Sequence, residues 1–206
     1  MHCHKILYRL LLCSFLLIAC KQTKHDLKRK SVTKPLFIAI QPLAFTDTQQ
    51  LHELKTQIET YYYFKVIILP NIALPPQAFY KPRNRYRADS LIRFLKDKPT
   101  NTDYIIGITA KDISSTKGDF PDFGIMGLGY RPGKSCVVST FRIKTPNPQL
   151  LKERLAKVAL HEIGHNVGLP HCTTKDCFMH DGEASIKQVD SEKLDLCNNC
   201  KKKIGL

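Results

Sequence analysis

Residues 161–172 read HEIGHNVGLPHC, and this stretch decides how the rest of the chain is interpreted. His161 and His165 are four residues apart, so on a helix they project from one face, about 6 Å apart along the axis. Two imidazoles in that position can bind one metal ion. Glu162 lies in the turn between them, where its carboxylate can take a proton from water at that metal. The stretch therefore predicts a metal site with its own general base.

The residues that follow supply a third ligand. Gly168 can adopt a positive φ, which ends the helix and lets the chain turn back. His171 can then reach the ion held by His161 and His165. Three neutral imidazoles leave one coordination position open for water, which is the arrangement of a catalytic zinc site.

Upstream of this stretch, apolar strand-like runs alternate with segments of helical spacing. Strands are expected at residues 36–41, 62–69 and 104–109, and helices from Thr46-Asp47, over 88–98, and from Asn147-Pro148 to Gly168. Residues 70–86 read as irregular, and the glycine-rich residues 123–130 are expected to pair with 135–143 as a hairpin at the rim of a cleft. Cys136 is expected in the core and His52 on the surface. This order predicts a mixed α/β fold.

Four cysteines near the C-terminal end suggest a second metal site. Cys172, Cys177, Cys197 and Cys200 form a C-x4-C and a C-x2-C pair, spacings suited to a tetrahedral zinc. Disulfides are the rival interpretation if the protein is exported, because an oxidising compartment favours them. Since a C-x2-C pair closes only with strain, the zinc interpretation is favoured.

Taken together, residues 161–200 follow the pattern HExxHxxGxxHC-x4-C-x-M-x17-C-x2-C. This pattern resembles the archaemetzincin family of zinc metallopeptidases, a branch of the metzincins. The resemblance implies a compact α/β domain with a mixed sheet, an active-site helix and a Met-turn, and a substrate cleft above that helix. It implies two zinc ions per chain, one catalytic and one structural. The residues implied are His161, His165 and His171 for the catalytic zinc, Glu162 as general base, Met179 at the Met-turn, and Cys172, Cys177, Cys197 and Cys200 for the structural zinc.

Three polar residues beside the Met-turn position are assigned more modest roles. His180 is expected to be a neighbour in the turn and not a ligand, because three histidines already fill the site. Asp181 and Glu183 either bond to the imidazoles of the ligands or belong to a solvated loop, and the solvated loop is favoured.

The N-terminal residues read as an export signal. Lys5 and Arg9 precede an apolar run from Leu10 to Ala19, which is too short to span a bilayer. The ending Leu-Ile-Ala-Cys resembles the lipobox of bacterial lipoproteins and predicts lipidation at Cys20. The alternatives are an ordinary signal peptide and chance apolarity in a cytosolic protein. The expected organisation is a signal peptide over 1–19, a lipidated basic tether over 20–34 and a metallopeptidase domain over 35–206.

The formal net charge of +14 is concentrated in a few places. Most of the excess comes from residues 21–34, 80–98 and 201–203, and the rest of the chain is close to neutral. A nucleic-acid groove more often spreads its charge and interleaves aromatic residues, so a zinc-knuckle nucleic-acid binder is disfavoured. The run at 21–34 either holds an anionic bilayer surface or is a solvated linker, and both interpretations stay open.

These observations combine into one functional hypothesis. The chain is expected to be an exported, membrane-anchored zinc metallopeptidase of the bacterial cell envelope that acts on peptides or proteins, with no nucleic-acid partner. The alternative is a zinc-loaded peptide-binding lipoprotein without significant turnover. Glu162 argues against that alternative, because a pure binder needs no general base. The oligomeric state is left open.

Overall fold

A computed structural model describes residues 35–180 and 185–206. The predictions for Cys20, the signal peptide, the tether, Asp181 and Glu183 fall outside these residues. Within the two described ranges, no helix has both the length and the apolarity that crossing a bilayer requires.

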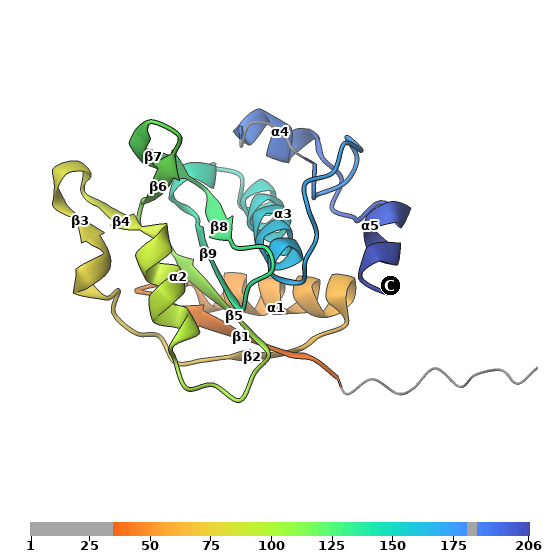
Figure 1. The fold of residues 1–206 in the computed structure, drawn as a ribbon, viewed down its shortest axis with the longest axis horizontal. Helices are drawn as coiled ribbons and strands as arrows, with labels where there is room; N and C mark the ends of the chain where they lie inside the picture. The colour runs from red at the N-terminus through yellow and green to blue at the C-terminus, as the bar shows by residue number, and fades with distance from the viewer. Residues whose placement is uncertain (1–34, 181–184) are drawn as a thin grey trace, which may run out of the picture. The chain divides into compact units, whose positions relative to one another are not determined.

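A five-stranded sheet in the order β2-β1-β5-β9-β8 forms the centre of the fold (Figure 1). Four strands run parallel, namely β1 (Phe37–Pro42), β2 (Lys65–Ile68), β5 (Tyr104–Thr109) and β9 (Ser135–Ser139). The fifth, β8 (Gly127–Gly129), pairs antiparallel with β9 and forms one edge. The predicted α/β class with a mixed sheet is therefore confirmed, and the strand expected at 104–109 has the observed bounds.

Helices cover both faces of this sheet (Figure 1). On one face lie α1 (Thr48–Tyr62) and α3 (Pro148–Asn166), and on the other lies α2 (Ala88–Lys96). Both expected caps are present: Asp47 accepts a hydrogen bond from the backbone of Gln50, and Asn147 accepts from Gln149 and Leu150. Capping satisfies backbone N–H groups that have no partner inside the helix, so these residues fix where α1 and α3 begin.

The helix α3 is buried along most of its length, unlike the other helices. A nearly continuous run from Arg154 to Gly164 is buried, broken only by His161, whereas α1 buries Leu51, Leu54, Ile58 and Tyr62 along one stripe. The sheet, α1 and the C-terminal segment together cover most of α3, which leaves His161 and His165 half-buried, whereas His171 beyond the helix is exposed.

The strand predicted at 62–69 begins later than expected. Tyr62 is the last residue of α1, and Tyr63 caps the helix in the left-handed conformation with a φ of 54°. The strand starts at Lys65. Tyr62 is aromatic and fits a strand by composition, but its buried ring packs beneath α3, where its hydroxyl donates to the carbonyl oxygen of Leu160 at 2.8 Å.

A second, four-stranded sheet corrects two predictions. It consists of β3 (Phe79–Tyr80), β4 (Arg85–Arg87), β6 (Ile113–Lys117) and β7 (Phe120–Ile125), in the order β3-β4-β6-β7. Residues 70–86 are thus not wholly irregular, and they also contain the short 3-10 helices η1 (Pro76–Ala78) and η2 (Lys81–Arg83). The expected hairpin of 123–130 with 135–143 is only partly right, because residues 123–125 pair with β6 and only Gly127–Gly129 pairs with β9.

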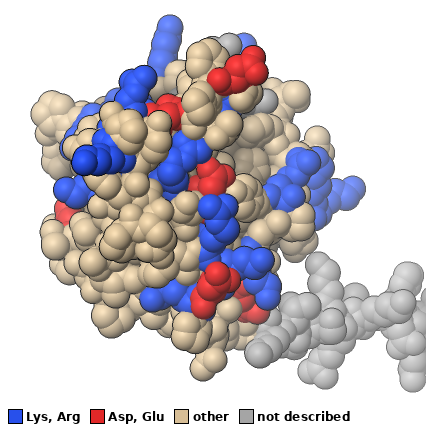
Figure 2. Space-filling view, turned by 60° about the vertical axis from the view of Figure 1, so that its left-hand side comes forward, with Lys and Arg blue, Asp and Glu red and all other residues tan. Residues whose placement is uncertain are grey.

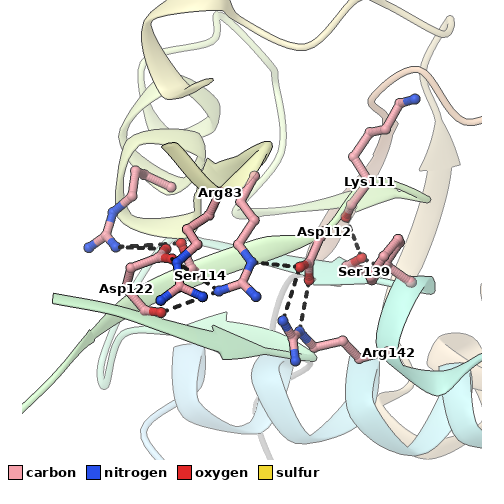
Figure 3. A network of polar contacts seen from close by, with 10 residues as sticks. Arg83, Lys111, Asp112, Ser114, Asp122, Ser139 and Arg142 are labelled. Carbon is pink, nitrogen blue, oxygen red and sulfur yellow. Dashed lines mark hydrogen bonds and ion pairs between the residues drawn. The ribbon is translucent and has the colours of Figure 1, made fainter. Parts of the chain in front are cut away.

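Arginine–aspartate ion pairs hold this second sheet against the end of the main one (Figure 3). Asp112 accepts from Arg85 at 2.7 Å and from Arg142 at 2.8 Å, and Arg85 also reaches Asp122 at 3.0 Å. Arg142 belongs to η3 (Phe141–Ile143), which follows β9. Part of the basic run at 80–98 is therefore neutralised by aspartates, and Figure 2 shows acidic residues among the basic ones on this face.

The C-terminal segment adds two short helices, α4 (Ile186–Ser191) and α5 (Asn198–Lys203). Two cations of α3 hold α4 in place. Arg154 makes a bidentate ion pair with Asp190, with both N···O distances at 2.6 Å. The ammonium of Lys157 donates to the carbonyl oxygen of Val189 at 2.9 Å. Such paired geometry fixes orientation as well as distance.

Candidate metal centres and active site

Three histidines converge at the C-terminal end of α3, as the sequence predicted. Their ring centroids lie 4.6 Å apart for His161 and His165, 4.8 Å for His165 and His171, and 5.3 Å for His161 and His171. Each offers one ring nitrogen to a group in which all the atoms lie within 4.8 Å of one another. The φ of Gly168 is 103°, which confirms the turn that brings His171 back to the helix.

Backbone carbonyls fix the orientation of two of these rings. Nδ1 of His161 lies 2.7 Å from the carbonyl oxygen of Phe178, and Nδ1 of His165 lies 2.9 Å from that of Leu169. A carbonyl oxygen can only accept, so each Nδ1 carries the proton. That tautomer leaves the lone pair on Nε2, and the Nε2 atoms of His165 and His171 lie 3.2 Å apart. The cluster therefore fits a metal that binds neutral imidazole nitrogens, and the donor set is that of zinc.

Glu162 is buried beside this cluster, with 8% of its surface exposed. Burial raises the pKa of its carboxyl group to about 8, although a hydrogen bond from the backbone of Gly129 acts in the opposite direction. Strand β8 passes very close above it: a β-carbon on Gly127 would lie 2.7 Å from Oε1 of Glu162. Only glycine permits that approach, so β8 both covers the carboxylate and restricts its position.

Met179 lies against the same turn of α3. It is fully buried, and a β-carbon on Gly164 would lie only 2.3 Å from its sulfur atom. Gly164 directly precedes His165, so the thioether packs against the helix at the level of the histidine ligands. This is the contact expected of the residue at the Met-turn position.

The four cysteines form a second cluster. Their sulfur atoms all lie within 4.8 Å of one another, with 3.7 Å between those of Cys172 and Cys197. A disulfide would bring two sulfur atoms to about 2.05 Å, and the cysteines in the described ranges are all free thiols. Backbone N–H groups of Thr174 and Cys197 point at the sulfurs of Cys172 and Cys177, both at 3.4 Å. Convergence of four thiols with N–H donors around them fits a tetrahedral zinc and not two disulfides.

Short backbone links join the two clusters. The N–H of Cys172 donates to the carbonyl oxygen of Met179 at 2.7 Å. Phe178, whose carbonyl oxygen orients His161, directly follows Cys177 in sequence. One segment from Cys177 to Met179 thus supplies a thiol to one cluster and a hydrogen-bond acceptor to the other.

A side pocket of about 280 Å³ extends from the histidine cluster to α4. His161, Glu162 and His171 line it at one end, and Gln188, Val189 and Glu192 line it at the other. Gly127 and its neighbours Ile125 and Met126 also line it, so the glycine-rich rim predicted from the sequence does border the site.

Sequence reasoning missed several groups that shape this site. His180 was assigned to the turn and is indeed outside the histidine cluster, but it lines the side pocket together with Lys157 and Glu192. The carbonyl groups of Phe178 and Leu169 carry no sequence signal at all. For Lys157 a signal existed, because it lies one helical turn before His161 and therefore on the same face of α3.

Comparisons with known proteins agree with this geometry. The model of Peptidase family M54 matches residues 46–205. An archaemetzincin of Methanocaldococcus jannaschii is 32% identical over 173 residues, covering 81% of this chain and 92% of that protein.

Solved structures of two archaemetzincins have the same fold. The one from Methanopyrus kandleri superposes with a TM-score of 0.73 at 25% identity, covering 83% of this chain and 94% of that one. The one from Archaeoglobus fulgidus, solved with malonate, superposes with a TM-score of 0.71 at 29% identity, covering 82% and 100%.

Proposed function

Since the chain belongs to peptidase family M54, the archaemetzincins, and is a zinc metallopeptidase, we propose how its own residues divide the work of hydrolysis. His161, His165 and His171 hold the catalytic zinc, and Cys172, Cys177, Cys197 and Cys200 hold the structural zinc. Glu162 is the general base. The observation that carries this assignment is the position of the Glu162 carboxylate, next to the imidazole cluster, within the side pocket and beneath β8.

Zinc, when bound, supplies a Lewis acid that polarises the scissile carbonyl and makes water more acidic. The carboxylate of Glu162 takes a proton from the attacking water as the new C–O bond forms. It then delivers that proton to the leaving nitrogen as the C–N bond breaks, so one residue serves as base and then as acid. The N–H of Gly129 orients the carboxylate, and burial keeps bulk water from competing for it.

Hydrolysis of a peptide mixture by wild type and by Glu162→Ala tests these roles. The variant should bind the same amount of zinc and should unfold at a similar temperature, because the substitution touches no ligand and removes a buried carboxyl that has few partners. Its turnover should fall by a factor of about 10² to 10⁴, the usual contribution of general acid–base catalysis. Undiminished cleavage by the variant would refute the role of Glu162. Zinc-dependent peptide binding without any cleavage by the wild type would favour the alternative of a peptide-binding lipoprotein.

We also propose that the peptidase is exported and anchored to a membrane of the bacterial cell envelope through lipid on Cys20, and that it meets its peptide or protein substrates there. The sequence Leu-Ile-Ala-Cys at 17–20 supports this proposal, together with the basic run that follows. The full-length chain should fractionate with membranes, and Cys20→Ser should move it to the soluble fraction. Identical fractionation of both forms, with no acyl group on the N-terminus by mass spectrometry, would refute the anchor and leave the peptidase assignment untouched.

A further inference from the structure

The far end of the side pocket contains a carboxylate that the proposed hydrolytic mechanism does not use. Glu192 follows α4 and is buried, with 8% of its surface exposed. Its Oε1 accepts a hydrogen bond from the amide of Gln188 and lies 3.8 Å from Nδ1 of His180. Among the described residues, no hydrogen-bond donor reaches Oε2. One lone-pair-bearing oxygen of a buried carboxylate is thus still available at this end of the pocket.

The walls between Glu192 and the histidine cluster are mostly apolar. Ile125, Met126, Val158, Phe178 and Val189 line them. A pocket of about 280 Å³ with such walls can take the long aliphatic part of a side chain. Its polar groups are concentrated at the catalytic end and around Glu192, so a guest with an apolar stem and a polar tip matches both parts.

The balance of charge at the far end is negative. Lys157 forms an ion pair with Glu153 at 2.7 Å, and it also acts on Glu192 from farther away. Two carboxylates therefore face one ammonium group. Lys117, the other lysine that lines the pocket, is exposed and lies over the ring of Phe123 at 4.7 Å. Glu192 has the imidazole of His180 at 3.8 Å, but the lysine nearest to it is already paired directly with Glu153. A buried carboxylate in this position gains from a cationic guest, because the pairing offsets the free energy lost on desolvation.

The position of Glu192 is well fixed. The ion pair between Arg154 and Asp190 and the hydrogen bond from Lys157 to Val189 both attach α4 to α3, which carries His161 and His165. The distance between the carboxylate and the reacting groups is therefore set by two directly bonded helices. Fixed spacing of this kind allows a pocket to select a side chain by its length.

We propose, on the basis of the proposed peptidase function, that the side pocket selects a peptide with arginine or lysine next to the scissile bond, and that Glu192 is the residue that determines this specificity. The aliphatic stem of the substrate side chain lies along the apolar walls. The guanidinium or ammonium group donates to Oε2 of Glu192. The carbonyl of the same peptide then lies at the end of the pocket formed by His161, Glu162 and His171.

Cleavage profiling of the full, zinc-loaded chain tests this proposal. The substrate is a mixture of peptides in which both residues flanking each bond vary over all side chains, with norleucine included as an uncharged match for lysine. Wild type should favour arginine or lysine over norleucine at one flanking position by roughly 10- to 100-fold, the range expected of a hydrogen bond between charged groups. Glu192→Gln, which keeps the shape of the side chain, should abolish that preference.

Asp176→Asn is the matched control. It removes one negative charge from the C-terminal segment, but the Asp176 side chain is exposed, pairs with Lys193, plays no part in holding α4 and does not line the pocket. This variant should keep the wild-type ratio of arginine to norleucine cleavage even if it is less stable. A wild type without a basic preference, or a Glu192→Gln variant that retains it, overturns the proposal.

A binding measurement separates this proposal from the peptidase assignment. The variant Glu162→Gln is used so that the peptides stay intact. Fluorescence anisotropy gives its affinity for a labelled peptide that contains arginine and for the same peptide with norleucine in place of the arginine. The arginine peptide should bind at least about tenfold more tightly, and the double variant Glu162→Gln/Glu192→Gln should bind both equally. If the wild type cleaves none of the peptides and this pattern of binding is still found, the result counts against the peptidase mechanism alone. Equal binding of both peptides to Glu162→Gln would refute the role of Glu192.

Discussion

Replacement of Gly127 by alanine should impair hydrolysis while leaving the protein folded. The added β-carbon would lie 2.7 Å from Oε1 and 2.8 Å from Cγ of Glu162. Favourable contacts of a carbon atom begin at about 3.5 Å, so the side chain of Glu162 has to move by roughly 1 Å. A displacement of that size at a reacting group can lower the rate about 100-fold, which is the effect expected on kcat/KM.

Stability should change little, because the atoms in conflict belong to a side chain that can rotate. A side chain forced from its preferred rotamer costs about 0.5–1.5 kcal/mol. For a domain of this size, about 1 kcal/mol lowers Tm by roughly 2–4 °C. The zinc content should stay that of wild type, since no ligand is displaced.

Gly129→Ala is the matched comparison, two residues along the same strand. Its β-carbon would lie 2.6 Å from the backbone carbonyl oxygen of Glu162, and a backbone atom cannot rotate away. Strand β8 or helix α3 has to shift, at a cost typical of overpacking, about 1–3 kcal/mol. We therefore expect a larger fall in Tm for Gly129→Ala than for Gly127→Ala.

Both variants would be purified with zinc and compared by peptide hydrolysis, elemental analysis and thermal unfolding. The reasoning fails if Gly127→Ala hydrolyses peptides within about twofold of the wild-type rate. It also fails if Tm falls equally in Gly127→Ala and Gly129→Ala, because a clash with a side chain and a clash with the backbone would then cost the same stability.

Three further results are expected. Elemental analysis should give two zinc ions per chain, and one zinc with two mapped disulfides would contradict the assignment of the cysteines. Cys200→Ser should weaken retention of the catalytic zinc by roughly 10- to 100-fold in chelator competition, because the segment from Cys177 to Met179 also orients His161. If Cys200→Ser retains zinc and hydrolyses peptides as well as the wild type, the two clusters are independent. Arg154 lowers the pKa of Asp190 in the folded protein, so this ion pair adds stability above the unfolded pKa near 3.8 and loses it as the pH falls through the folded value. Because 35% of the Asp190 side chain is exposed, the ion pair contributes less than about 1 kcal/mol to the free energy of unfolding. The difference in Tm between wild type and Asp190→Asn should therefore shrink as the pH falls from about 6 to about 3. A difference that stays constant over this range would contradict the role of the ion pair.

The parts of the fold that were predictable have strong local causes. Asp47 and Asn147 have side chains that bond to the first turn of a helix, so α1 and α3 begin where the sequence indicates. The strand at Tyr104–Thr109 is buried on both faces and reads as a continuous apolar run. The spacing of His161 and His165 predicts that they lie on one face of α3, since residues four apart on a helix share a face.

The remainder depended on contacts between distant residues. Strand β6 carries Ser114, Ser115 and Thr116, and β7 contains Pro121, so neither has the composition of a strand. Their pairing is stabilised by ion pairs of Asp112, which directly precedes β6, and of Asp122 in β7. The arginine partners come from β4 and from η3. The orientation of His161 depends on a carbonyl group 17 residues away, which no residue type encodes.

The enclosure of α3 on nearly every side limits how this helix can diverge among related proteins. A helix with one buried stripe, such as α1, tolerates many substitutions on its solvent-exposed face. In α3 the buried run includes three ionisable residues, Arg154, Lys157 and Glu162. The first two are bonded to α4, and a hydrogen bond from Gly129 reaches the third, so even the polar positions of this helix have fixed partners. Sequence divergence should therefore be confined to the first six residues, 148–153. A substitution farther along would need a compensating change in the sheet, in α1 or in the C-terminal segment.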